Sequence, residues 1–158
     1  MAELESVMTV ELQIRGPYPI SEHQLAVNIE SGSLLGSGTF EGELSGSVIA
    51  PSGDVIVVQK TGTFERNVRL IASMEDGSHL LMEYGGRTVP TEEFQRKADA
   101  QEIIKGSEVY FKIQPTFSTE SEKHAWLNDY IFVGDMEEIV FPSPEVSGRV
   151  KYMIYRVL

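Results

Sequence analysis

The side chains of this sequence best suited to chemistry are carboxylates, amides and cations that share the polar face of apolar-patterned segments. They are Glu41, Glu65, Asn67, Arg69, Lys112, Trp126 and Asn128. A carboxylate can move a proton in general acid–base catalysis. A nearby cation can stabilise the negative charge that develops on an enolate or phenolate. We therefore predict Glu41 as the proton-transfer group and Arg69 or Lys112 as the group that stabilises the negative charge.

A second set of side chains is predicted to bind the substrate. Amide groups can orient a carbonyl or hydroxyl group, and aromatic rings can stack on a flat molecule. The predicted substrate-binding residues are Glu65, Asn67, Tyr110, Trp126, Asn128 and Tyr130. Each prediction has a structural alternative. Glu41 could pair with Arg69 across strands, Lys112 could be a surface lysine, and Trp126 could be a packing anchor.

No familiar catalytic signature accompanies these residues. The chain has neither a phosphate-binding Walker loop nor a dinucleotide fingerprint. It has no cysteine, which excludes disulfides, thiolate metal sites and a cysteine nucleophile. His23, His79 and His124 form no pair at ligand spacing, so a metal site would have to be assembled in space. We therefore predict chemistry without a metal or cofactor.

The elements that must position these residues are short strands between turn signals. Pro51 to Asp54 and Glu75 to Ser78 are the strongest turns. The predicted strands are residues 8–15, 24–29, 38–50, 55–59, 62–74, 79–84, 109–117, 124–133 and 149–157. One helix is predicted over residues 91–105, with Thr91 as its N-cap and Gly106 as its end.

This arrangement predicts an all-β, mostly antiparallel fold. About nine strands at short spacing indicate a sandwich or a barrel. Gly42 and Gly46 inside a long strand favour tight bends, and hence a closed or nearly closed barrel that is lipocalin-like in outline. No repeat or domain boundary is visible, so residues 1–158 are predicted to form a single domain.

Each long strand has one apolar face and one mixed polar and aromatic face, which leaves two interpretations open. In the first, the apolar faces fill the barrel and the mixed faces meet water, as is usual for antiparallel sheets. In the second, the mixed faces line a ligand cavity, as large aromatics beside a few polar groups often do. The apolar faces would then need cover, and a homo-oligomer would be expected.

Composition limits the partners. The 158-residue chain is long enough for one domain with a substantial core. Its formal net charge of −11 argues against nucleic acid and against anionic membrane surfaces. No secretory signal and no apolar stretch near the ~20 residues of a membrane span is visible. The expectation is a cytoplasmic protein.

Several segments together resemble a known family. They are residues 38–42 with Gly46, Asp76-Gly77, residues 110–112 with Pro115 and Phe117, residues 126–128 with residues 132–134, and Tyr152 with Tyr155. In this order and spacing the set resembles the barrel family known as domain of unknown function 3237, over residues 8–158. The resemblance implies a compact β-barrel, often oligomeric, that needs no cofactor and occurs beside biosynthetic or catabolic enzymes.

The sequence departs from the family pattern at two places. Where relatives often carry Asp-x-Arg, this chain has Asn67-Val68-Arg69, which removes a possible general base. Where relatives often carry Tyr-Phe-Arg, it has Tyr110-Phe111-Lys112, which exchanges a planar clamp for a point charge.

Two functions remain open at this stage. The first is a cofactor-free cyclase, isomerase or hydro-lyase of natural-product type metabolism that acts on a flat, hydrophobic, phenolic or polyketide-like substrate. The second is a non-catalytic barrel that carries or senses a small molecule. Replacement of Glu41 by Gln would distinguish them, because only the enzyme should lose turnover.

Overall fold

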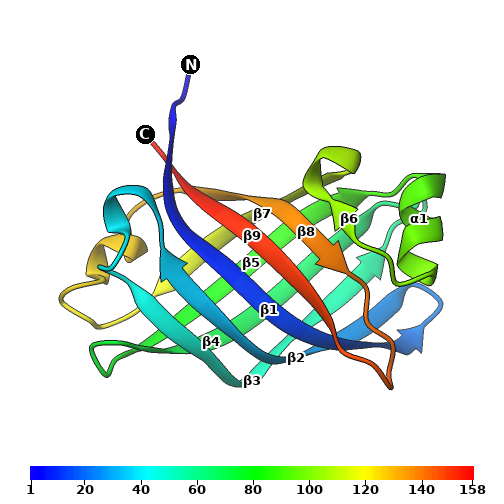
Figure 1. The fold of residues 1–158 in the computed structure, drawn as a ribbon, viewed down its shortest axis with the longest axis horizontal. Helices are drawn as coiled ribbons and strands as arrows, with labels where there is room; N and C mark the ends of the chain where they lie inside the picture. Colours follow the sequence, from blue (N-terminus) through cyan, green and yellow to red (C-terminus); the bar gives the residue numbers. More distant parts are fainter.

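The computed structural model describes residues 1–158 and shows an antiparallel β-barrel with one short α-helix at one end (Figure 1). Its strands are β1 (Leu4–Ser21), β2 (Gln24–Gly36), β3 (Ser45–Val58), β4 (Phe64–Met74), β5 (His79–Val89), β6 (Ile104–Lys105), β7 (Tyr110–Ser118), β8 (Phe132–Val140) and β9 (Gly148–Val157). The α-helix is α1 (Glu92–Asp99). Three 3-10 turns complete the fold: η1 (Gly38–Phe40), η2 (Gly106–Glu108) and η3 (Ala125–Asn128).

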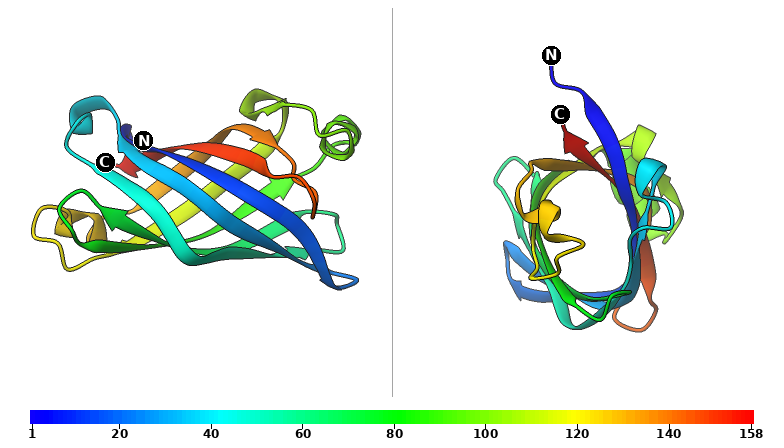
Figure 2. Two further views of the ribbon diagram at one scale, coloured as in Figure 1. Left: turned by 60° about the horizontal axis from the view of Figure 1, so that its bottom comes forward. Right: turned by 90° about the vertical axis from the view of Figure 1, so that its left-hand side faces the viewer.

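Eight of the strands close on themselves. Neighbours pair in the order β8-β7-β5-β4-β3-β2-β1-β9, and β9 pairs back with β8. The short β6 is an additional strand that pairs with β8 alongside β7. The ring is visible end-on in the right-hand view of Figure 2. Closure removes the free edges that an open sheet would expose. The predicted antiparallel barrel with a single short helix is confirmed.

The apolar faces of the strands point into the barrel. On β4 the buried residues include Val68, Leu70 and Ala72, and the exposed ones are Asn67, Arg69 and Ser73. On β7 Phe111 and Ile113 are buried, whereas Tyr110 and Lys112 are exposed. The first interpretation therefore holds, and the mixed faces meet solvent instead of lining a cavity. The apolar faces need no further cover, so the argument for an oligomer loses its premise.

The strand predicted over residues 38–50 begins later than expected. Gly38 has a φ of +58° and Gly42 a φ of +79°. These left-handed conformations, which suit glycine, belong to a turn and not to a strand. Residues 38–40 form η1, and β3 starts at Ser45. It then continues through the predicted turn at Pro51, with an irregularity in its pairing to β4 between Ile49 and Gly53.

The strand predicted over residues 124–133 is wrong. Residues 125–128 form η3, and β8 starts only at Phe132. Alternation along this segment therefore assigned the wrong faces. Leu127 and Phe132 are both buried, and Ile131 is 73% exposed. A 3-10 turn has three residues per turn, so alternate residues no longer share a face.

The predicted helix is confirmed in place but is shorter. Thr91 is the N-cap, and its side chain accepts a hydrogen bond from the Phe94 amide. The helix ends at Asp99, and Gln101 takes a φ of +55°. Residues 104–105 then form β6 instead of continuing the helix. No helix in the structure is long and apolar enough to cross a membrane.

Candidate functional site

A pocket opens at the end of the barrel beside α1. Its volume is about 370 Å³, and its lining is mostly apolar. The lining residues are Ile14, Pro17, Leu25, Val27, Ile56, Phe64, Phe94, Gln95, Ala98, Asp99, Gln101, Phe141, Pro142, Ser143 and Pro144. This position, the mouth of a β-barrel, is a usual place for a small-molecule site.

The helix α1 supplies one wall of this pocket. Its two buried residues, Phe94 and Ala98, face the barrel. The Phe94 ring meets Phe141 edge-on at 5.4 Å between ring centroids and lies 6.3 Å from the ring of Phe64. The Thr91 cap begins the helix next to these contacts. Three aromatic rings from three distant segments therefore surround the opening.

A buried ion pair lies inside the barrel, two residues along β3 and β4 from the pocket-lining Ile56 and Phe64. Arg66 Nη1 donates to Asp54 Oδ2 at 3.2 Å, and the two side chains are 7% and 6% exposed. The other carboxylate oxygen of Asp54 accepts the Asn67 amide at 3.0 Å. Arg66 Nη2 lies 3.4 Å from the hydroxyl oxygen of Thr88, and its guanidinium carbon lies 4.3 Å from the Phe111 ring centroid.

The register of the strands relates the Arg66 guanidinium to one residue of the pocket lining. Arg66 itself pairs with Gly86. Its guanidinium, however, contacts Thr88 and Phe111, which pair with each other in the β5–β7 ladder. Thr88 also pairs with Phe64, one of the residues that line the pocket. The charged end of Arg66 therefore lies next to Thr88, the ladder partner of a pocket-lining residue, although Arg66 itself does not line the pocket.

Burial alters the protonation of Asp54 and of two buried tyrosines. Burial raises the pKa of the Asp54 carboxyl, although Arg66 and the Asn67 amide oppose the effect. Burial also raises the pKa of Tyr152 and of Tyr84, whose rings meet at 5.5 Å. The interior thus holds a carboxyl group that accepts a proton more readily than an exposed aspartate does.

The structure does not bring the three predicted catalytic residues together. Glu41 is exposed in the loop between η1 and β3. Arg69 is exposed on β4 and pairs with Glu83 at 3.1 Å. Lys112 is exposed on β7 and pairs with Asp135 at 2.6 Å.

The predicted substrate-binding residues are divided among three places. Glu65 and Tyr110 lie on the outer wall, where Glu65 pairs with Arg87 at 2.9 Å. The side chain of Asn67 is exposed on β4. The remaining three lie in or beside η3, at the end of the barrel opposite α1 (Figure 1).

These three residues hold η3 in place. The Asn128 side chain accepts the Thr119 amide and donates to the Thr119 carbonyl. The guanidinium carbon of Arg156 lies 5.2 Å from the Trp126 ring centroid and 4.8 Å from that of Tyr130. These contacts agree with the structural alternative for Trp126, which is that it acts as a packing anchor.

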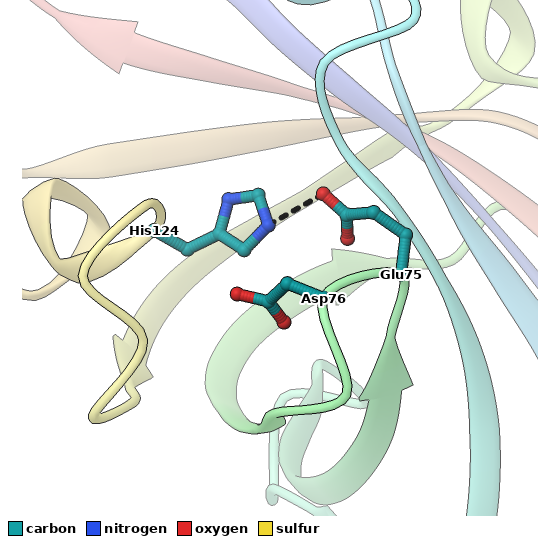
Figure 3. Close-up of side chains that lie close together, drawn as sticks. All are labelled: Glu75, Asp76 and His124. Atoms are coloured by element: carbon teal, nitrogen blue, oxygen red, sulfur yellow. Dashed lines mark hydrogen bonds and ion pairs between the residues drawn. The ribbon is translucent and has the colours of Figure 1, made fainter.

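The same end of the barrel contains the one cluster with donors for a metal ion. Glu75, Asp76 and His124 each offer a ligand atom within 4.8 Å of the others, and His124 is buried (Figure 3). His124 Nε2 lies 2.7 Å from Glu75 Oε1, and Lys123 pairs with the same carboxylate at 3.2 Å.

The cluster also has a structural explanation. Asp76 accepts hydrogen bonds from Ser78 and Ser121. With the contacts of Glu75 to Lys123 and His124, these bonds join the β4–β5 turn to the segment before η3. We call Glu75, Asp76, Ser121 and His124 the far-end latch. Its residues are distant in sequence, which is why no histidine spacing revealed it.

The Asp54–Arg66 pair was missed for an identifiable reason. Asp54 lies in a Pro-Ser-Gly-Asp run that reads as a turn. Arg66, however, lies between Phe64 and Val68 on the apolar face of its strand. A charged residue on that face is unusual, because buried charges require a partner. The arginine on an apolar strand face was therefore the sequence signal that could have revealed the pair.

Comparison with known proteins agrees with the geometry. Residues 2–157 match the family model described as "Protein of unknown function (DUF3237)". The chain belongs to this family. A UPF0311 protein of Clostridium acetobutylicum is 27% identical over 135 residues, which cover 82% of each chain. The family resemblance inferred from residues 8–158 is confirmed.

Solved structures share the barrel. A conserved protein of unknown function from Rhodopseudomonas palustris superposes with a TM-score of 0.83 at 23% identity, over 100% of this chain and 99% of the other. A structure described as an enzyme from Penicillium herquei superposes with a TM-score of 0.63 at 17% identity, over 99% and 95% of the two chains. At these identities the comparison establishes the DUF3237 barrel fold alone.

Proposed function

We propose that this protein binds a small, flat, apolar molecule in the pocket beside α1 and acts on it by acid–base chemistry without a cofactor. Asp54 transfers the proton, and Arg66 stabilises the negative charge that develops on the substrate. The observation that carries this proposal is a buried carboxyl–guanidinium pair whose members lie two residues along their strands from Ile56 and Phe64 of a mostly apolar pocket.

The chemistry of the pair suits proton transfer. A general base or acid works best when its pKa is close to the working pH. Burial raises the pKa of Asp54 in that direction. A fixed cation next to the reacting group acts strongly where water is excluded. Isomerisation, cyclisation and addition to a double bond all require one proton to be removed and another to be returned.

The likeness to the Penicillium herquei structure, which is described as an enzyme, supports an enzymatic role for the barrel. The pocket supports the same substrate class as the sequence did, because Phe64, Phe94 and Phe141 surround it. Flat phenolic or polyketide-like molecules can place their rings against these side chains.

Binding is tested with a fluorescent reporter at the pocket. Trp126 is the only tryptophan in the chain and lies at the opposite end of the barrel. We would replace Trp126 by Phe and Phe141 by Trp, and titrate a panel of flat phenolic compounds. Saturable quenching of the new tryptophan supports the site. Quenching by no compound, with the double variant folded, contradicts it.

Turnover is tested by deuterium exchange. Each compound that binds and has a C–H group next to a carbonyl is incubated in D₂O, and deuterium incorporation at that carbon is followed by mass spectrometry. Asp54→Asn should slow exchange by about 100-fold or more while binding remains, because a positioned acid–base group contributes about 10²–10⁴ in rate. Glu41→Gln and Glu83→Gln, on the outer surface, are matched controls that should exchange at the wild-type rate. Exchange that survives in Asp54→Asn would exclude Asp54 as the proton carrier.

The second candidate is a non-catalytic carrier or sensor. It is favoured by one contact, the hydrogen bond from the Asn67 amide to Asp54, which gives Asp54 a structural role in the β3–β4 wall. A carrier would bind ligands in the reporter assay and show no enzyme-dependent exchange with the wild-type protein.

A further inference from the structure

The guanidinium of Arg66 has more hydrogen-bond donors than partners. A guanidinium carries five N–H groups. Within the protein, Arg66 donates to Asp54 at 3.2 Å and to Thr88 at the long distance of 3.4 Å. Its Nε is buried and has no partner. Donors left without partners inside a protein are costly, and each one requires an explanation.

Arg66 is also the one lysine or arginine among the buried residues. Its only buried charge partner is Asp54, which additionally accepts the Asn67 amide. Because burial raises the pKa of Asp54, this carboxyl can become neutral more easily than an exposed one. A neutral Asp54 would leave Arg66 as an uncompensated cation in the barrel interior.

The neighbouring groups show where this charge lies relative to the pocket. The guanidinium contacts Thr88, which pairs with the pocket-lining Phe64, while Arg66 itself is not part of the lining. The one carboxylate in the pocket lining, Asp99, belongs to α1 at the rim, where Gln95 donates to it at 2.9 Å. The pocket lining thus holds one carboxylate at its rim and no cation, and the one buried arginine, Arg66, lies two residues along β4 from Phe64 of the lining.

We propose that the ligand of this pocket is an organic acid. Its flat apolar body lies between Phe64, Phe94 and Phe141, and its carboxylate or comparable anionic group accepts hydrogen bonds from Arg66. This inference rests on the proposed function, because it names the class of molecule that the same pocket takes. A carboxylate suits the site because it is planar and can accept two N–H groups from one guanidinium.

The test uses probes matched in shape and different in charge. The neutral dye N-phenyl-1-naphthylamine reports occupation of the pocket by its increase in fluorescence. It is then displaced with 2-naphthoate or with the neutral 2-naphthamide. Hydrogen bonds to charged groups are strong enough to separate the two probes by about tenfold or more. We expect the wild-type protein to prefer naphthoate by at least this factor.

Two variants assign the preference to Arg66. Arg66→Met removes the charge with little change in length and should abolish the preference, whereas Arg69→Met on the outer face should leave it intact. If Arg66→Met does not fold, Arg66→Lys takes its place. It keeps the charge and should show a smaller preference than the wild-type protein. Equal displacement by the two probes in the wild-type protein would overturn the inference and leave the pocket's function standing. A dye that does not bind, or that neither probe displaces, would overturn both the inference and the proposed function.

Discussion

The ring of Trp126 lies nearly parallel to the ring of Phe40, with 4.7 Å between centroids and 15° between planes. This stack joins η3 to η1, which are far apart in the sequence, and Arg156 covers both rings (5.9 Å to Phe40 and 5.2 Å to Trp126). It lies at the end of the barrel opposite α1. The single tryptophan therefore reports on the end of the barrel that does not contain the proposed site.

The stack predicts how the native tryptophan behaves. Phe40→Ala should shift Trp126 emission to longer wavelength and lower the free energy of unfolding by about 1–2 kcal/mol, since an aromatic pair contributes about 0.5–1.5 kcal/mol beyond its buried area. Emission spectra and urea unfolding measure the two effects. Ligands of the α1 pocket should leave Trp126 emission unchanged in the wild-type protein. A ligand that quenches the fluorescence of Trp126 but not that of a tryptophan at position 141 would place binding at the end opposite α1 and contradict the proposal.

The Asp54–Arg66 pair should be strongly coupled in stability. Removal of one member leaves the other charge buried, which costs about 3–5 kcal/mol. Asp54→Asn and Arg66→Met should each destabilise the protein by about this amount, and the double variant by clearly less than the sum. Urea denaturation of the four proteins at neutral pH completes the double-mutant cycle. Additive losses would mean that the two side chains do not depend on each other.

The far-end latch should make stability depend on acid. Hydrogen bonds from Ser121 and Ser78 hold the pKa of Asp76 well below its usual range. For Glu75, burial alone raises the pKa, but hydrogen bonds from Lys123 and His124 lower it overall. Carboxyl groups with lowered pKa stabilise the folded state above their unfolded pKa, which is about 4, and lose this effect as the pH falls further.

The corresponding measurement is the melting temperature of Asp76→Asn and of the wild-type protein between pH 7 and pH 2. The variant should melt lower at neutral pH, and the difference should shrink below about pH 4. The control is Asp129→Asn, which replaces an exposed aspartate next to η3 and should follow the wild-type curve. A difference that stays constant with pH would show that Asp76 contributes through shape and not through charge.

The cap of α1 should control one wall of the pocket. Thr91→Ala removes the side-chain oxygen that accepts the Phe94 amide at 3.1 Å and should cost about 1 kcal/mol. Hydrogen exchange should accelerate in residues 92–99 in particular, and naphthoate should bind more weakly. Thr91→Ser keeps the oxygen and should behave as the wild type does. Unchanged exchange in Thr91→Ala would mean that packing of Phe94 alone holds the helix.

Local sequence signals succeeded where they concerned a single element. The cap at Thr91, the alternation along β4 and β7 and the closed antiparallel architecture could all be inferred from residue types and spacing. They failed at the 38–42 and 125–128 segments, where 3-10 turns interrupt runs that look like strands. Parity is informative only while the chain stays extended, so the turn at residues 125–128 reversed the faces assigned to Ile131 and Phe132.

By itself, the sequence determined the fold class and the family, because alternation, turn residues and a set of local motifs are properties of short segments. Only the tertiary structure decided which face is inside and which residues meet. Asp54 and Arg66 come together because β3 and β4 pair in one register, and the Arg66 guanidinium meets Thr88 and Phe111 because β5 and β7 place these two residues side by side. Barrel closure sets these distances, and no short segment encodes them.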